Sequence, residues 1–146
     1  MARLRALIGV LALAGCVGPG GQSPGDPGLA RIEIFSGGSF SGSSTVTVYV
    51  DDKVVTATSG PFGEGASQHA VLGRPGLYAE LVAYAAKQGP KVAQRQRRTL
   101  AACPDYGMDG VRLDPAAGGF DGLSASCPDP VVIDFLGRLR AMIAAR

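Results

Sequence analysis

The fold of this chain is decided by the stretch Thr45-Val46-Thr47-Val48-Tyr49-Val50-Asp51-Asp52-Lys53-Val54-Val55-Thr56-Ala57-Thr58. In residues 45–50, threonine or tyrosine alternates with valine, and all three residue types favour β-strands. This pattern predicts a half-buried strand. Asp51-Asp52-Lys53 predicts a hairpin turn, and residues 54–58 predict the returning strand. The rest of the domain is therefore expected to assemble around an antiparallel hairpin.

The flanking segments extend this hairpin into a small sheet. On the N-terminal side, Arg31-Ile32-Glu33-Ile34 alternates polar and apolar residues, which is typical of a half-buried strand. Residues 36–44 are rich in Gly and Ser and are expected to form a loop. On the C-terminal side, residues 68–72 predict a fourth, weaker strand. The N-terminal half is thus predicted to be a hairpin or meander.

The hydrophobic period changes after residue 74. Within residues 75–88 an apolar face recurs at helical spacing, made of Leu77, Leu81, Tyr84 and Ala85. Gly89-Pro90 is expected to end this helix, because proline lacks an N–H and disfavours helix at the residue before it. Residues 91–102 fit either a second helix or a strand.

The C-terminal third begins with a turn-rich region. Residues 103–127 hold five glycines, with short strand candidates at 111–113 and 123–125. Asp129-Pro130 predicts a helix N-cap followed by proline at the first helical position. The helix should run towards Ala145 with an apolar face formed by Val132, Phe135, Leu136, Leu139 and Ile143. The predicted fold is α+β, a small antiparallel sheet packed with two or three helices, one of them C-terminal.

The N-terminus has the organisation of an export signal. Arg3 and Arg5 precede the apolar residues 6–14, and Leu13-Ala14-Gly15-Cys16 follows directly. This tetrad resembles the lipobox of bacterial lipoprotein signal peptides, in which a leucine and two small residues lead to the cleavage point. The resemblance implies cleavage before Cys16 and a diacylglyceryl group on its thiol.

Two other interpretations of the leader stay open. Its apolar run would rise only about 14 Å as a helix, roughly half of a bilayer's hydrocarbon core, which disfavours a permanent membrane span. It could instead form a buried N-terminal helix of a cytosolic protein. Ala12-Leu13-Ala14 also fits soluble secretion with cleavage before Gly15. The cysteine placed directly after Leu-Ala-Gly favours the lipoprotein interpretation.

The resemblance implies a division of the chain into three parts. Residues 1–15 would be the cleaved signal peptide, residues 16–29 the lipidated cysteine with a flexible Gly/Pro tether, and residues 30–146 a single globular domain. The whole chain carries 14 basic and 12 acidic side chains. Because the leader holds two arginines and no acid, the mature chain is formally neutral. We therefore expect no nucleic-acid partner.

The cysteine count depends on the same resemblance. If one of the three cysteines, Cys16, carries lipid, Cys103 and Cys127 remain as an even pair. In an oxidising compartment we expect them to form a disulfide. The alternative is two reduced thiols with a redox or metal role, but the separation does not fit the closely spaced redox motif C-x-x-C.

Several residues are candidates for chemistry, each with an ordinary structural alternative. His69, the only histidine, could join Ser67 or another serine in a triad, although no nucleophile-elbow motif is present. A loop with Asp105, Asp109, Gly110 and Asp114 partly resembles a calcium loop, but a central ligand and the bidentate glutamate are missing. A basic cluster is formed by Lys91, Arg95, Arg97 and Arg98, and could meet anionic headgroups. Residues 60–65 lack the spacing and lysine of a phosphate-binding loop.

The predicted function is that of an exported, lipid-anchored lipoprotein in the cell envelope. Resemblance to the lipoprotein families favours the outer membrane facing the periplasm, since Val17 rather than aspartate follows the cysteine. We expect the domain to act as a non-enzymatic binding or envelope-assembly module for an envelope protein, with no cofactor or metal. The alternatives are a small periplasmic hydrolase with a spatially assembled site and an inhibitor of a foreign hydrolase. An exposed apolar patch or protruding loop would favour the binding module.

Overall fold

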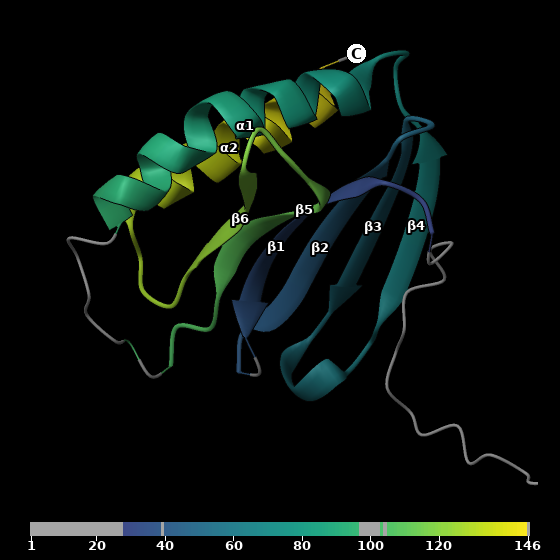
Figure 1. Ribbon diagram of the computed structural model, residues 1–146. Helices are drawn as coiled ribbons and strands as arrows, with labels where there is room; N and C mark the ends of the chain where they lie inside the picture. Colours follow the sequence, from purple (N-terminus) through teal and green to yellow (C-terminus); the bar gives the residue numbers. More distant parts are fainter. Residues whose placement is uncertain (1–27, 39, 97–102, 104, 146) are drawn as a thin grey trace, which may run out of the picture.

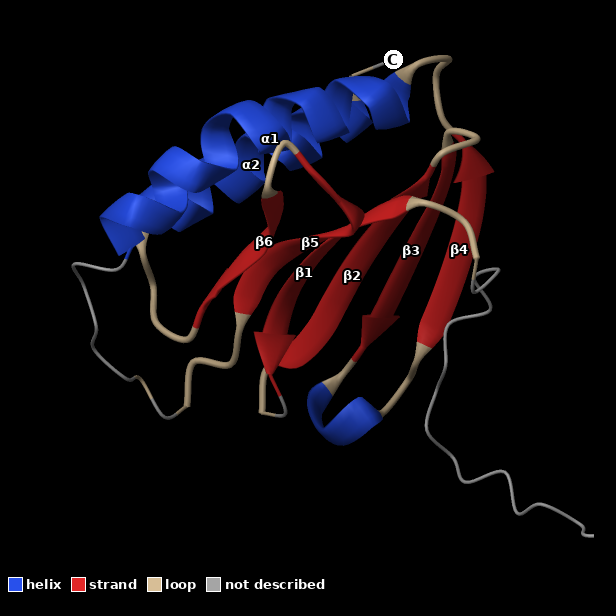
Figure 2. Ribbon diagram, in the orientation of Figure 1, coloured by secondary structure: helices blue, strands red, loops and turns tan. Residues whose placement is uncertain are grey.

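The computed structural model describes residues 28–38, 40–96, 103 and 105–145 of the chain. In this part, six strands form one antiparallel sheet in the spatial order β4-β3-β2-β1-β5-β6, and two α-helices pack on one of its faces (Figures 1 and 2). The elements along the chain are β1 (Arg31–Gly38), β2 (Gly42–Tyr49), β3 (Lys53–Ser59), a short 3-10 turn η1 (Pro61–Gly63), β4 (Ser67–Leu72), α1 (Leu77–Gln96), β5 (Asp109–Ala117), β6 (Phe120–Ala125) and α2 (Pro130–Ala144). The predicted α+β fold with a C-terminal helix is confirmed.

The first four strands form a meander in which each pairs with the next. The hairpin predicted from residues 45–58 lies at its centre as β2 and β3. Helix α1 then carries the chain back across one face of the sheet, so that β5 pairs with β1 and not with β4 (Figure 1). The two sheet edges are therefore β4 and β6.

The core lies between the helices and the sheet face that they cover. It is built from the apolar faces predicted for the two helices and from alternate residues of the strands. The buried members of this core are Ile32, Ile34, Val48, Val54, Leu77, Leu81, Ala85, Val92, Val111, Leu113, Phe120, Ala125, Val132, Phe135, Leu136 and Leu139. Tyr49 and Val55 are also buried but lie outside this cluster, on the opposite face of the sheet.

The start of α2 is as the sequence predicts. The Asp129 side chain accepts hydrogen bonds from the backbone N–H groups of Val131 (2.9 Å) and Val132 (3.4 Å), and Pro130 occupies the first turn. These bonds satisfy donors that have no partner inside the helix. The local signal was sufficient because every group involved lies within three residues.

The predicted end of α1 is wrong. The helix continues through Gly89-Pro90 to Gln96, and residues 97–102 lie outside the described part of the chain. Gly89 and Val92 are buried, and a Cβ at Gly89 would stand 2.4–2.6 Å from three ring atoms of Phe120 in β6. Packing of this half of α1 against β6 and α2 therefore outweighs the hydrogen bond that Pro90 cannot make.

The strands are longer than the local patterns indicate. Of the segment 36–44, expected as a loop, residues 36–38 end β1 and residues 42–44 begin β2, and the pairing of these strands continues to Gly38 and Gly42. The short candidates at 111–113 and 123–125 extend into β5 and β6, which pair as a hairpin with a register shift between Arg112 and Ala117. Pairing with a neighbour supplies the hydrogen bonds that these glycine-rich segments could not obtain locally.

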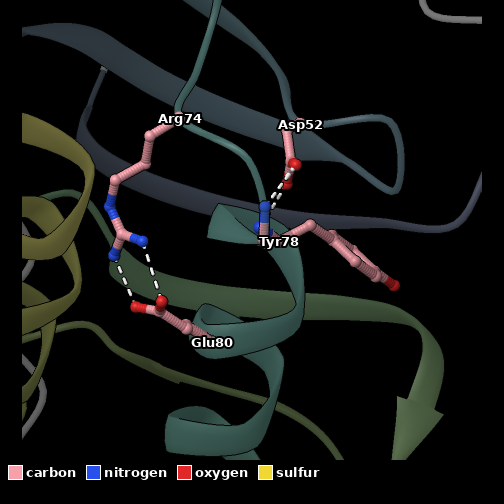
Figure 3. Close-up of polar contacts among 5 residues, drawn as sticks. Asp52, Arg74, Tyr78 and Glu80 are labelled. Atoms are coloured by element: carbon pink, nitrogen blue, oxygen red, sulfur yellow. Dashed lines mark hydrogen bonds and ion pairs between the residues drawn. The ribbon is translucent and has the colours of Figure 1, made fainter. Parts of the chain in front are cut away.

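The first turn of α1 is fixed by the hairpin turn between β2 and β3 (Figure 3). The Asp52 carboxylate accepts hydrogen bonds from the backbone N–H groups of Gly76 (2.6 Å) and Tyr78 (2.8 Å). Next to it, the Arg74 guanidinium forms a two-pronged ion pair with Glu80. The bond to Arg74 lowers the pKa of Glu80 below its usual value. The turn that was predicted only to reverse the chain therefore also caps a helix.

Candidate functional site

Cys16 lies outside the described residues, so the lipidation site stays a prediction. The described helices include none that combines the length and the apolar character needed to cross a membrane. The other two cysteines are described. Cys103 and Cys127 form a disulfide with their Cα atoms 5.0 Å apart, as predicted. The bond joins the segment before β5 to the segment before α2.

His69 stands on the exposed edge strand β4, directly opposite Thr56 of β3. The nearby hydroxyl of Ser67 is hydrogen-bonded to the hydroxyl of Thr58 at 2.8 Å. In the described part of the chain, the imidazole makes no hydrogen bond to a serine or carboxylate. A triad needs a nucleophile hydrogen-bonded to an imidazole that is in turn hydrogen-bonded to an acid. The described residues do not form this arrangement around His69.

Two of the acidic residues expected to share one loop, Asp109 and Asp114, lie in strand β5, which corrects that prediction. Asp109 accepts a hydrogen bond from the Tyr106 hydroxyl, and this bond raises the pKa of Tyr106 to about 12. Asp114 lies five residues further on, so the two side chains point to opposite faces of the sheet. Asp114 pairs instead with Arg31 of β1 at 3.2 Å.

These acids therefore do not form a cation site. Among the residues that the structure describes, no group of three or more His, Cys, Asp or Glu side chains lies close enough together to hold a metal ion. The sequence spacing was uninformative because a calcium loop must curl around its ion, whereas residues 109–114 are extended.

Part of the predicted basic cluster lines a groove between the two helices. Lys91 and Arg95 of α1 meet Arg138 of α2 around a hollow of about 280 Å³. Asp134 pairs with Arg138 at 3.0 Å, and the bond raises the pKa of the arginine. At the groove, the rings of Tyr84 and Phe135 are stacked with centroids 5.8 Å apart. Arg97 and Arg98 lie outside the described residues.

A second candidate surface lies at the end of the sheet where β1 turns into β2 and β3 leads to β4. Phe40 lies in the connection between β1 and β2, and Phe62 lies in the connection between β3 and β4. Their rings pack edge to face, with centroids 5.4 Å apart. Both rings are nevertheless largely in solvent, with exposed fractions of 67% and 72%. We call this pair the aromatic tip. Two large apolar side chains held together in water are unusual unless another surface covers them.

The backbone holds the aromatic tip in an uncommon shape. Phe62 has a φ of 55°, a left-handed conformation that bulky residues rarely adopt. The loop around it is closed by hydrogen bonds from the Gly60 N–H to the Glu64 carbonyl (2.6 Å) and from the Glu64 N–H to the Pro61 carbonyl (3.1 Å). Backbone strain of this kind clusters at active sites, ligand clamps and switch regions.

An open hollow of about 470 Å³ adjoins the aromatic tip. Its lining combines the Phe62 ring with glycines that leave the backbone accessible, Gly38, Gly60 and Gly63. The hydroxyls of Ser43 and Ser59, also in the lining, are hydrogen-bonded to each other at 2.8 Å. The hollow therefore offers an apolar wall, backbone without side chains in front of it and a hydroxyl pair side by side.

The aromatic tip was missed at the sequence level. Phe62 lies in the segment 60–65, a Gly-rich stretch without the spacing of a phosphate-binding loop, and Phe40 lies in a segment expected to be a loop. The available signal was a single phenylalanine inside each of two Gly-rich turns. Their contact could not be inferred, because it depends on β1 and β2 extending into the segment 36–44, which was expected to be a loop. No protein-family model, no curated protein and no solved structure matches this chain.

Proposed function

We propose that the chain is an exported bacterial lipoprotein, cleaved before Cys16 and acylated there, whose residues 30–146 bind a partner protein of the cell envelope. The observation that carries the export proposal is the disulfide between Cys103 and Cys127. Such bonds persist in oxidising compartments and are rare in the cytosol. The bond also accounts for two of the three cysteines and leaves the one that ends the tetrad 13–16.

The lipid on Cys16 would supply the membrane contact. A single acyl chain gives weak, reversible binding, and stable anchoring requires a second chain or another signal. A diacylglyceryl group provides two chains at one residue. Since Val17 rather than aspartate follows the cysteine, we place the anchor in the outer membrane, with the domain facing the periplasm.

Replacing Cys16 by serine should release the protein from membranes. Serine keeps the shape of the residue but removes the thiol on which the acyl group is built. In bacterial cells that make the full chain, the wild type should incorporate a fatty-acid label and sediment with the outer membrane. The Cys16→Ser variant should do neither.

A second variant separates the position of the cysteine from its mere presence. Cys16→Ser combined with Ser23→Cys keeps one thiol in the same segment but not in the tetrad, and it should also remain unlabelled. If Cys16→Ser keeps its label and its membrane fractionation, the lipoprotein proposal is wrong. If the double variant is labelled, the tetrad is not what directs acylation.

The aromatic tip is the surface that we assign to partner binding. Its two exposed rings and the adjoining hollow match an apolar side chain whose flanking backbone can bond to the Ser43 and Ser59 hydroxyls. Burying rings of this size would contribute a large part of the affinity, because aromatic residues dominate binding energetics at interfaces.

Photo-crosslinking tests this assignment in the envelope. A photoreactive phenylalanine analogue at position 62 preserves the ring, and in cells carrying the full chain it should give a covalent adduct with an envelope protein. The matched control is the same analogue at Val50, which is half exposed at the opposite end of β2. If the adducts are equally abundant at both positions, or absent at both, the assignment of partner binding to the aromatic tip is wrong.

A further inference from the structure

The two edge strands of the sheet differ in the features that would prevent pairing with another chain. Strand β4 is exposed along its whole length, and it includes Leu72 and Val71 with exposed fractions of 81% and 48%. Its sequence, Ser-Gln-His-Ala-Val-Leu, contains no lysine, arginine, aspartate, glutamate or proline. Charges, prolines and bulges are the usual devices that prevent an edge strand from pairing with another chain. Strand β4 has none of these devices.

The other edge strand, β6, is protected. The Gln96 side chain at the end of α1 donates a hydrogen bond to the backbone carbonyl of Ser124. Asp121 adds an exposed charge, and the β5–β6 pairing is interrupted by a register shift. These features obstruct strand addition at β6. Pairing with another chain is therefore expected at β4 alone of these two edges.

The pairing of β4 with β3 shows which backbone groups remain available. The register is continuous from Lys53↔Leu72 to Thr58↔Ser67, and the Gly73 N–H bonds to the Asp52 carbonyl at 2.8 Å just beyond it. In an antiparallel ladder, hydrogen-bonded and non-bonded pairs alternate. Residues 67, 69, 71 and 73 therefore direct their N–H and C=O groups to β3. Gln68, Ala70 and Leu72 direct theirs outwards, to solvent.

We propose that two copies of this chain pair antiparallel through β4, about a two-fold axis at Ala70. In this register Ala70 lies opposite Ala70 of the second copy, and Gln68 lies opposite Leu72. Every outward N–H and C=O group of the strand then has a partner. Moving the axis to Gln68 or Leu72 would leave part of each strand unpaired, because the strand begins one residue before Gln68 and ends at Leu72.

The side chains of β4 are compatible with a second copy of themselves. The strand contains no lysine, arginine, aspartate or glutamate, so the approach of two copies places no such charges opposite each other. Ala70 is small enough to stand at the axis. On the face that carries the helices, His69 of one copy comes opposite Val71 of the other, which covers an apolar side chain that is half exposed in the single chain.

Cysteine crosslinking tests both the pairing and its register. In a hydrogen-bonded antiparallel pair the two Cα atoms are about 5.5 Å apart, which suits a disulfide. The full-length Ala70→Cys variant should therefore form a disulfide-linked dimer on mild oxidation. The wild type controls for Cys16, and Asp121→Cys places an exposed cysteine on β6. Neither the wild type nor the Asp121→Cys variant should form the disulfide-linked dimer.

Two substitutions at Ala70 should abolish the dimer without affecting the single chain. Ala70→Pro removes an N–H that β3 does not use, so the internal ladder is kept. Ala70→Lys places like charges directly opposite each other, and Ser124→Lys is its control on β6. Sedimentation should show dimers for the wild type and Ser124→Lys, and monomers for both Ala70 variants, all with wild-type circular dichroism.

Three outcomes would overturn the proposal. One is a wild-type protein that sediments as a monomer at every concentration. Another is an Ala70→Cys variant that crosslinks no more than Asp121→Cys. The third is crosslinking of Ala70→Cys to a different protein instead of to itself. None of these outcomes bears on the anchor at Cys16 or on the aromatic tip, because β4 pairing uses neither.

Discussion

Replacing Cys103 and Cys127 together by serine should lower the free energy of unfolding by about 3.5 kcal/mol, on the chain-entropy estimate for a loop of this size. The two cysteines are 24 residues apart. The loop that they close contains the β5–β6 hairpin, whose glycines give the unfolded chain a large number of conformations. Without the bond, folding must order that whole segment against its full conformational entropy.

Urea unfolding of the full chain, followed by circular dichroism, measures this loss. The midpoint should fall for the double-serine variant, and reducing the wild type should produce the same change. The reductant should have no effect on the variant, which makes it the matched control. A double-serine variant as stable as the wild type would mean that packing of β5 on β1 and of α2 on the sheet orders the segment unaided.

The parts of the fold that the sequence predicted are those whose causes lie close together in the chain. The β2–β3 hairpin follows from an alternation of six residues and a turn, and the start of α2 follows from Asp129 and Pro130. Helix faces follow in the same way, because a period of 3.6 residues needs no partner to be recognised. In each of these cases the deciding groups lie within a few residues of one another.

The predictions that were wrong concern residues whose structure depends on partners far away in the sequence. Residues 89–96 are helical because Gly89 fits against the Phe120 ring, which is 31 positions away in the sequence. Asp52 caps α1 from a turn that lies more than twenty residues earlier. A propensity or a turn motif contains no information about such distant partners. The tertiary contact overrides the local preference, as it commonly does.

The candidate site was less predictable than the fold, for the same reason. The predicted disulfide required only a cysteine count and a compartment, and it is confirmed. The aromatic tip required knowledge that two loops meet at one end of the sheet. Candidate ligands such as Asp109 and Asp114 were close in sequence, but an extended strand turns them to opposite faces. Proximity along the chain is therefore a poor guide to proximity in a β-rich domain.

Substituting alanine for Gly89 should destabilise the protein by about 2 kcal/mol, although alanine is the better helix former by about 1 kcal/mol. The added Cβ would lie 2.4–2.6 Å from three atoms of the Phe120 ring. Phe120 is buried among the core residues and cannot swing into solvent. Either the ring or the axis of α1 must shift, and both movements disturb packing on β6.

A second glycine provides the control. Gly137 lies in α2, and a Cβ built there meets no atom within 4 Å apart from its chain neighbours and the backbone of its own helix. Gly137→Ala should therefore stabilise the protein by about 0.5–1 kcal/mol through helix propensity alone. The same chemical change is thus expected to have opposite signs in the two helices, and urea midpoints of the two variants measure it directly.

A double-mutant cycle assigns the cost at Gly89 to the ring. Phe120→Leu alone should destabilise the protein by removing buried ring atoms. Combined with Gly89→Ala, it should cost less than the sum of the two single changes, because leucine leaves room for the new methyl group. If the two effects simply add, or if Gly89→Ala behaves like Gly137→Ala, then contact with Phe120 is not the reason that glycine occupies position 89. In that case, packing of Val92 and its neighbours alone would keep α1 helical through Pro90.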